Sequence, residues 1–314
     1  MAPELSVVIA TSGRDSLRTA LARLRHPGAE VIVVGGVDCA PGLVEGIVAD
    51  AAPPGTRVLP SEYLGPTGKR ELGWRAAGAP LVCFIDDDVL ADPGLLDAHL
   101  AVHRAHPDPE LAVLGRVRWA REIHVTPFMR WLERGPLFDY AALDAAYAAG
   151  VTDAGWGRFC TANISLKREL LERVGGFDTE HFDFLYEDVD LGKRLHEQAG
   201  LQLRYHPAAS AEHLSRPDLP GWTARMAVLA DAERRYVRCH PDQPPFFHDF
   251  FLRAAARPPA RGRGARLARL VPRETPWLGP QVWASAEAVW AQTLGAAFLQ
   301  AWRAAEADAG PTNE

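Results

Sequence analysis

Residues 81–88 read Leu-Val-Cys-Phe-Ile-Asp-Asp-Asp, five apolar residues followed directly by three carboxylates. A continuous apolar run of this length is typical of a strand buried on both faces of a parallel sheet. Ligands of such sheets bind beyond the carboxyl ends of the strands, where the loops converge. The triplet Asp86, Asp87 and Asp88 can be an acidic loop before the next helix, but its place at the strand end favours a functional site.

The sequence before this stretch alternates apolar strands with helical segments. Strands are predicted at residues 5–10, 30–34 and 57–59, and helices at 17–24, 43–51 and 69–77. This alternation predicts an α/β domain whose largely parallel sheet is covered by helices on both faces. The loops after Ala10, Val34 and Ile85 then share one edge of the sheet. No Gly-x-Gly-x-x-Gly motif follows the first strand, so the standard dinucleotide fingerprint is absent.

The same pattern continues less regularly beyond the acidic triplet. A helix carrying Leu95 is followed by a strand at residues 111–117, and residues 119–158 are irregular and rich in aromatics, as in a pocket wall or a lid. Further elements are expected in the order helix, helix, edge strand. These are a helix on Leu166, Leu170 and Val174, a helix at 187–198, and a strand at 201–205.

Beyond residue 215 the chain is rich in Ala and Arg and mostly helical. Residues 253–273 hold seven arginines and no acidic residue. We favour a solvated basic surface here, and docking to acidic lipids or an acidic partner is the alternative. The last helix carries an apolar stripe that can pack on its own protein or form a homo-oligomer contact. The stripe consists of Trp283, Val289, Trp290, Leu294, Phe298 and Trp302.

The composition places the chain among ordinary globular proteins. It has 314 residues, 47% of them hydrophobic and 24% charged, with a formal net charge of −6. Disorder, collagen and coiled coil are therefore excluded as classes, and the acidity argues against nucleic-acid binding. No apolar run approaches the roughly 18 residues that span a bilayer. The N-terminus does not read as a secretory signal, and four scattered cysteines favour reduced thiols, so we expect a cytoplasmic protein.

A second acidic motif, Glu187-Asp188, begins a predicted helix. The positive helix dipole at that end is sufficient reason for acidic residues. The apolar residues just upstream, Phe182 among them, would also desolvate Asp188 and make it a better general base. His213 follows a predicted strand and is a candidate metal ligand or an ordinary surface histidine. The acidic triplet itself has the oxygen donors that Mg²⁺ or Mn²⁺ prefers.

The order of these motifs resembles glycosyltransferase family 2, whose members have the GT-A fold. The matching segments are SVVIATSGR at 6–14, GKRELGWRAAGAPLVCFIDDDVLADP at 68–93, and residues 160–213, which include GGFD, EDVDLGKRL and a final His. The resemblance covers about two-thirds of the chain. It implies a mixed, mainly parallel sheet flanked by helices. We expect a catalytic domain at 1–214, divided at residue 118 into donor and acceptor halves, and a helical extension at 215–314.

The resemblance also implies roles for individual residues. Asp188 is the expected catalytic base, and Asp88 and His213 are the expected ligands of a divalent cation. Donor contacts are expected from Thr11, Arg14, Asp38, Arg70, Asp86 and Asp87, and acceptor contacts from Asn163 and Glu187. Trp156, in the aromatic segment, is a further acceptor candidate because a sugar's apolar face stacks on aromatic rings. One departure is Gly35-Gly36-Val37-Asp38 in place of the usual DDGS, so a uracil preference is not transferred.

These expectations together predict a metal-dependent inverting glycosyltransferase. Its donor would be a nucleoside-diphosphate sugar, and its acceptor hydroxyl would belong to a glycan, a lipid-linked sugar or a small molecule. Peripheral contact with the inner face of the membrane, through the C-terminal region, is compatible with this activity. Two alternatives remain. A sugar-phosphate nucleotidyltransferase shares the acidic metal chemistry but opens with a longer Gly-rich loop, and a non-catalytic glycan-binding or partner-binding relative has no need of both acidic motifs.

Overall fold

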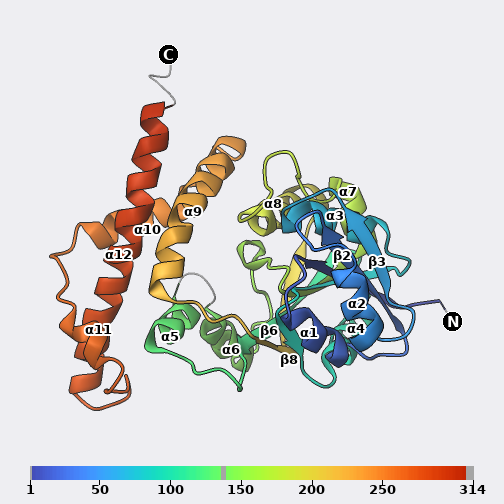
Figure 1. The fold of residues 1–314 in the computed structure, drawn as a ribbon, viewed down its shortest axis with the longest axis horizontal. Helices are drawn as coiled ribbons and strands as arrows, with labels where there is room; N and C mark the ends of the chain where they lie inside the picture. Colours follow the sequence, from blue (N-terminus) through green and yellow to red (C-terminus); the bar gives the residue numbers. More distant parts are fainter. Residues whose placement is uncertain (1, 136–138, 309–314) are drawn as a thin grey trace. The chain divides into compact units, whose positions relative to one another are not determined.

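The computed structural model describes residues 2–135 and 139–308, which form two compact units (Figure 1). The first unit comprises residues up to 123 together with 139–215, and the second comprises 124–138 and 216 onward. The chain therefore leaves the first unit after residue 123, contributes a helix to the second unit, and returns to the first unit at residue 139. Part of the aromatic-rich segment 119–158 thus belongs to each unit, and its Phe138 lies outside the described residues.

The first unit is built on one mixed eight-stranded sheet. Its strands are β1 (Leu5–Thr11), β2 (Ala29–Gly36), β3 (Arg57–Ser61), β4 (Leu81–Ile85), β5 (Val89–Ala91), β6 (Leu111–Trp119), β7 (Asn163–Lys167) and β8 (Gln202–His213). They follow the order β3-β2-β1-β4-β7-β6-β8-β5. The first four positions pair in parallel, whereas β7 is antiparallel to both β4 and β6, and β6 pairs in parallel with β8. This confirms the predicted fold class.

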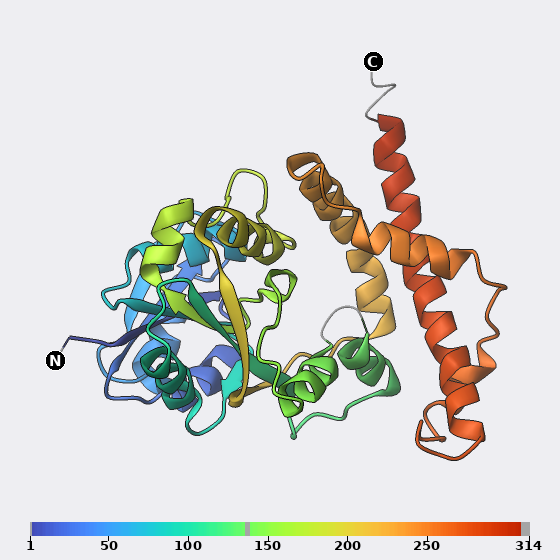
Figure 2. The ribbon, with the colours of Figure 1, turned by 180° about the vertical axis from the view of Figure 1, so that it is seen from behind.

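Helices cover both faces of this sheet. They are α1 (Ser16–Arg23), α2 (Leu43–Ala51), α3 (Pro66–Arg75), α4 (Leu95–Ala105), α6 (Tyr140–Ala148), the short η1 (Trp156–Arg158), α7 (Arg168–Val174) and α8 (Glu187–Ala199). Viewed from behind, α7 and α8 still lie on the side of the sheet opposite α1 and α4 (Figure 2). Alternate residues of each central strand therefore face different helices, which explains why these strands are apolar throughout.

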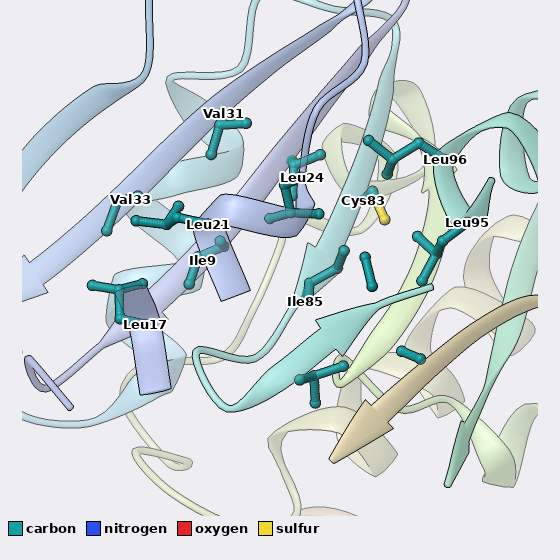
Figure 3. Packing of buried hydrophobic residues seen from close by; sticks show 14 of the residues in the cluster. Ile9, Leu17, Leu21, Leu24, Val31, Val33, Cys83, Ile85, Leu95 and Leu96 are labelled. Atoms are coloured by element: carbon teal, nitrogen blue, oxygen red, sulfur yellow. The ribbon is translucent and has the colours of Figure 1, made fainter. Parts of the chain in front are cut away.

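The core on one face joins the central strands to α1, α2 and α4. Figure 3 shows Leu17 and Leu21 of α1 close to Ile9 and Val33, with Leu95 of α4 near Ile85. All of these side chains are almost fully buried. At ~25 cal/mol per Å² of buried apolar surface, such side chains are the main source of the unit's stability. The packing fixes the carboxyl end of β4, and with it the acidic triplet.

Two sequence-based element predictions were wrong. Leu166 lies in strand β7 and not in the helix predicted with Leu170 and Val174, because α7 starts only at Arg168. The strand predicted at 201–205 extends to His213 and pairs on both sides, with β6 and β5, so it is not an edge strand. In both cases pairing with neighbouring strands, which periodicity cannot register, decided the structure.

The second unit is helical. It contains α5 (Pro127–Arg134), α9 (Leu219–Cys239), α10 (Phe246–Ala255), α11 (Arg263–Leu267) and α12 (Leu278–Asp308). The apolar stripe of α12 is almost wholly buried within this unit, with Trp283 and Phe298 4% and 0% exposed. Phe298 stacks on Trp302 and packs against Phe251 of α10. In the described ranges, no helix combines the length and apolarity needed to cross a membrane.

Two helical glycines offer a test of the packing between α3 and the sheet. Gly73 of α3 faces β1, and an added Cβ would overlap the side chain of Val8, whereas Gly46 of α2 faces open space. Alanine normally stabilises a helix interior by about 0.5–1 kcal/mol relative to glycine. We expect Gly46→Ala to raise the free energy of unfolding by that amount and Gly73→Ala to lower it by about 1–3 kcal/mol, because the core is overpacked.

Urea denaturation of both variants measures this difference directly. An equal gain in the two variants would show that α3 does not approach the sheet this closely.

Candidate active site

The loops after β1 and β4 meet at the carboxyl edge of the sheet. The Thr11 hydroxyl donates to Asp87 at 2.7 Å and accepts from the backbone N–H of Gly13 at 2.9 Å. Gly13 has a φ of +79°, a left-handed conformation that glycine adopts without steric cost, so the turn can close on Thr11. Burial raises the pKa of Asp87 although Arg14 and Thr11 oppose that shift. The contacts confirm the edge predicted from the strand pattern.

Asp88 lies between a guanidinium and an imidazole. One carboxylate oxygen is 2.7 Å from Arg14 Nη1, and the other is 3.2 Å from Nε2 of His213, the last residue of β8. Burial raises the pKa of Asp88, but the hydrogen bond and charge of His213, together with Arg14, bring it below the ordinary value. The His213 ring stacks on Trp119 of β6, with centroids 5.7 Å apart. Asp88 and His213 are therefore brought together as predicted.

Arg70 connects the two acidic motifs. From α3 its Nη2 donates to Asp86 at 2.7 Å and its Nη1 donates to Glu187, at the start of α8, at 2.9 Å. Both Arg70 and Glu187 are buried, and Asp86 is about one-third exposed. Burial and the neighbouring charge of Asp188 raise the pKa of Glu187 to about 7, against the opposing effect of Arg70. The guanidinium therefore holds Glu187, which is 117 positions from Arg70 in the sequence, in one cluster with Asp86.

Asp188 is held by a residue that the sequence prediction missed. Its two carboxylate oxygens accept from the backbone N–H and the hydroxyl of Thr161, at 3.0 and 2.8 Å. Burial raises the pKa of Asp188, and Arg70 and Thr161 lower it in part. The preceding Leu185 and Tyr186 both have a φ of +66°, which is uncommon for residues with large side chains. Such strain is a recurrent feature of functional sites, and here it directs the chain into α8.

A second cation, Lys69, was also missed. Its Nζ lies 2.8 and 2.9 Å from the two carboxylate oxygens of Asp38 and donates to the Thr11 carbonyl at 3.0 Å. Gly36 makes room for this pair, because an added Cβ would overlap both side chains. The unusual Gly35-Gly36-Val37-Asp38 segment thus belongs to a local ion pair. The sequence did contain a signal for Lys69. It is a lysine in a predicted helix, directly before Arg70, and that helix packs on the apolar strand β1.

Five of the residues described above border a cleft of about 330 Å³, which is within the size range of small-molecule sites. Thr11, Arg14, Asp38, Lys69 and Asp87 line it on the sheet side. Asp183 and Phe184, from the loop before α8, lie on its other side. The Asp183 carbonyl accepts from the Thr67 hydroxyl at 2.8 Å, which fixes this loop to the start of α3. The cleft therefore combines cations, carboxylates and one aromatic ring.

Two predicted acceptor residues, Asn163 and Trp156, do not line this cleft. Asn163 is fully buried, and its amide donates to the carbonyls of Arg116 and Ala209 while its oxygen lies 2.9 Å from His99 Nε2. The structure therefore contradicts the prediction that Asn163 faces an acceptor, because its hydrogen-bonding groups join strands in the core. Trp156 is half-buried on η1 and stacks on His196, two turns along α8 from Asp188. Its acceptor role stays a prediction.

Two side chains of the site have the chemistry of ligands for a divalent cation. Asp88 and His213 present an oxygen and a nitrogen 3.2 Å apart, which is compatible with two ligands of one ion. Mg²⁺ commonly binds through one or two carboxylates and keeps water or phosphate oxygens as its other ligands. No group of three or more His, Cys, Asp or Glu side chains suited to a metal occurs in the described residues. The pair therefore fits a cation that shares its coordination with a phosphate.

The mixed sheet, with clustered carboxylates at its carboxyl edge, defines a GT-A-type fold. A family model described as "Glycosyltransferase like family 2" matches residues 3–232. The chain therefore belongs to this family, as the motif order predicted.

Similar proteins agree with that membership. The chain is 32% identical over 146 residues to validoxylamine A glucosyltransferase of Streptomyces hygroscopicus subsp. jinggangensis, covering 40% of this chain and 34% of the relative. It is 28% identical over 252 residues to the O-antigen biosynthesis protein RfbC of Myxococcus xanthus, covering 72% and 19%. The chain thus spans about a third or less of these relatives' length.

Among solved structures, S. aureus TarS 1–349 in complex with UDP-GlcNAc matches with a TM-score of 0.50 at 13% identity, covering 95% of this chain and 92% of that one. A mycobacterial protein matches with a TM-score of 0.50 at 19% identity, covering 74% of each chain. At these identities the likeness shows the fold alone.

The Arg70 bridge allows a prediction of how the stability of an Arg70 variant depends on pH. Arg70→Met leaves Glu187 buried without its cation, which typically costs about 3–5 kcal/mol of stability. Because the folded-state pKa of Glu187 lies above its ordinary 4.5, the folded state favours the protonated form, and stability falls as pH rises through about 7. We expect a larger loss at pH 8 than at pH 5.5 in urea denaturation.

Adding Glu187→Gln to Arg70→Met is the matched control. It removes the unpaired charge, so the double variant should recover stability at pH 8 and lose most of the pH dependence. Equal losses at both pH values in the single variant would contradict the bridge.

Proposed function

We propose that this chain transfers a sugar from a nucleoside-diphosphate donor to an acceptor hydroxyl, with inversion at the anomeric carbon. The observation that carries the proposal is the Arg70 bridge, which joins Asp86 of the acidic triplet to Glu187, the neighbour of Asp188. Membership of the family and likeness to a named glucosyltransferase support sugar transfer. A single displacement requires the donor site and a general base to lie close together, and the Arg70 bridge holds the two acidic motifs in one cluster.

Asp188 is the proposed general base. As the acceptor oxygen forms its bond to the anomeric carbon, the bond from that carbon to the diphosphate oxygen breaks, and the hydroxyl proton moves to Asp188. The carboxylate has about four lone-pair positions, so its two hydrogen bonds from Thr161 leave room for the proton. These bonds also fix its orientation. The raised pKa of Asp188 makes the carboxylate a stronger base than an exposed aspartate.

The donor side is proposed to lie at Thr11, Arg14, Asp86 and Asp87, where positive charge is available for a diphosphate. Arg14 is suited to contact phosphate, because its side chain is 57% exposed and can turn away from Asp88. Asp88 and His213 would hold Mn²⁺ or Mg²⁺. That cation, when bound, would neutralise charge on the departing diphosphate.

The nucleobase side is proposed to include the Lys69–Asp38 pair. Its ammonium is buried and directs all three donors at Asp38 and the Thr11 carbonyl, so the pair would present only the partly exposed Asp38 carboxylate to a base, and no uracil preference follows. The acceptor is proposed to approach from the side of Trp156 and to be a glycan, a lipid-linked sugar or a small molecule. The free thiols of Cys39, Cys83 and Cys160 support a reducing, cytoplasmic setting.

Removing the base tests the mechanism. General-base catalysis is worth about 10²–10⁴-fold, so Asp188→Asn should lower the rate of transfer by that factor while donor binding changes less than about twofold. Release of nucleoside diphosphate from the bound sugar nucleotide measures the rate. Asp50→Asn, at an exposed carboxylate of α2, is the control.

A second variant ties the effect to the base's pKa. The Thr161 hydroxyl lowers the pKa of Asp188, so Thr161→Val should raise it and move the acid limb of the pH–rate profile to higher pH. An unmoved limb, or normal turnover by Asp188→Asn, would remove Asp188 from this role.

Thermal unfolding with nucleoside diphosphates and their sugars, each with and without Mn²⁺, tests the donor and the cation. A ligand at a hundredfold excess over its Kd stabilises the native state by about 2.7 kcal/mol, so a true donor should raise Tm clearly. We expect Asp88→Ala to lose the Mn²⁺-dependent part of the shift. Asp97→Ala, at an exposed carboxylate of α4, should retain it. Identical shifts in both variants would contradict the metal assignment.

A further inference from the structure

One segment of the second unit, residues 258–278, exposes large apolar side chains and buries small residues. Four large side chains are exposed: Leu267 (45%), Leu270 (79%), Trp277 (89%) and Leu278 (52%). Gly264 and Ala268 of the same segment are buried. If the segment packed mainly to fill the core of its own unit, its large apolar side chains would be buried and its small residues exposed. Several large apolar side chains exposed within one short segment are typical of an interaction site.

The segment is firmly attached to α12, so its exposed side chains are presented by folded structure. Gly264 packs so closely on α12 that an added Cβ would overlap Ser285. The Trp283 indole donates to the Val271 carbonyl at 2.9 Å, and Arg273 lies 3.2 Å from Glu287. Contacts before and after the exposed leucines therefore fix the backbone and leave Leu267 and Leu270 pointing away from the unit.

Trp277 occupies a backbone conformation that is disfavoured for a bulky residue. Its φ is +64°, and the surrounding turn is closed by hydrogen bonds from Leu278 N to Pro276 O at 2.7 Å and from Gly279 N to Thr275 O at 3.0 Å. Gly279 packs against the carbonyls of Pro272 and Arg273, so this turn adjoins the arginine-rich part of the segment. A strained conformation that exposes an indole is not explained by packing within the unit.

The same segment is strongly basic. Arg261, Arg263, Arg266 and Arg269 are exposed, and in the part of the chain that the structure describes none lies within 4.0 Å of a carboxylate oxygen. Arg266, Arg269 and Arg273 also border a hollow of about 1200 Å³ with Arg130 and Arg134. Two acidic residues, Asp218 and Glu274, share that lining. The hollow is therefore suited to phosphate groups, which guanidinium binds in bidentate geometry.

We propose that residues 258–278 dock the protein on the surface of a membrane that contains anionic phospholipids. The arginines would contact lipid phosphates, while Trp277, Leu267 and Leu270 would enter the region between headgroups and acyl chains, where tryptophan is favoured. A membrane surface offers negative charge and an apolar layer together, which matches both properties of the segment. A second copy of this chain matches only the apolar part, since two such faces would repel each other. The proposal does not depend on the transfer reaction.

The test is flotation of the full-length chain with vesicles of phosphatidylcholine alone and of phosphatidylcholine with one-third phosphatidylglycerol. We expect binding to the anionic vesicles that weakens as salt is raised. Arg266→Gln combined with Arg269→Gln should lower the partition coefficient about 25-fold, at about fivefold for each arginine. Trp277→Ser combined with Leu270→Ser should lower it at least tenfold, because apolar area is lost.

Matched controls are Arg25→Gln and Val151→Ser, both at exposed positions of the first unit, and neither should change partitioning. All four substituted residues of the segment are exposed, so circular dichroism should show an unchanged fold. Absence of flotation would overturn the proposal, as would equal binding by the segment variants. Concentration-dependent dimers that Trp277→Ser abolishes would identify a second copy as the occupant instead. No sugar donor is present, so an inactive transferase would leave these results unchanged.

Discussion

The guanidinium of Arg70 is the contact on which the site depends. The acidic triplet ends a strand of the parallel half of the sheet, and Glu187-Asp188 begins a helix a hundred residues later, so nothing local brings them together. Carboxylates at this density repel one another and are costly to bury unless a cation lies between them. Arg70, itself buried, donates to both groups. Without it, the charge of the cluster would oppose the folding that assembles it.

Thr161 and Lys69 have comparable structural roles, because each holds one carboxylate of the site in place. Thr161 directs two donors at Asp188, so the base is oriented before any substrate arrives. Lys69 neutralises Asp38 and also binds the Thr11 carbonyl, which connects the ends of β1 and β2 through α3. The three cations Arg14, Lys69 and Arg70 differ in exposure: two are buried and fixed, and Arg14 is mostly exposed. The site thus combines a rigid frame with one mobile positive charge.

The sequence was informative wherever one local property decided the structure. Apolar runs followed by acidic residues correctly predicted the end of β4 and the shared edge of the strands. The acidic pair Glu187-Asp188 correctly predicted the start of α8. The sequence was misleading where non-local contacts decided. Leu166 fits a helical period but lies in β7, which pairs with β4. Asn163 fits an acceptor-binding motif, but its amide donates to backbone carbonyls in the core. Thr161 has no distinguishing pattern at all, since its role exists only once β7 and α8 are adjacent.

The net charge of the sequence likewise does not show where the charged groups lie in the fold. A net charge of −6 averages an acidic edge, compensated internally by buried cations, with a basic segment in which only Arg273 has a carboxylate partner among the described residues. The two populations of arginine are chemically equivalent, yet their neighbours give them different consequences. Arg70 is paired with both Asp86 and Glu187 and therefore stabilises the fold, whereas Arg266 and Arg269 have no carboxylate partner among the described residues and are exposed. These two arginines and an exposed indole lie in the same segment, which favours a partner outside the chain. Solvation alone does not explain why Trp277 is exposed in a strained turn.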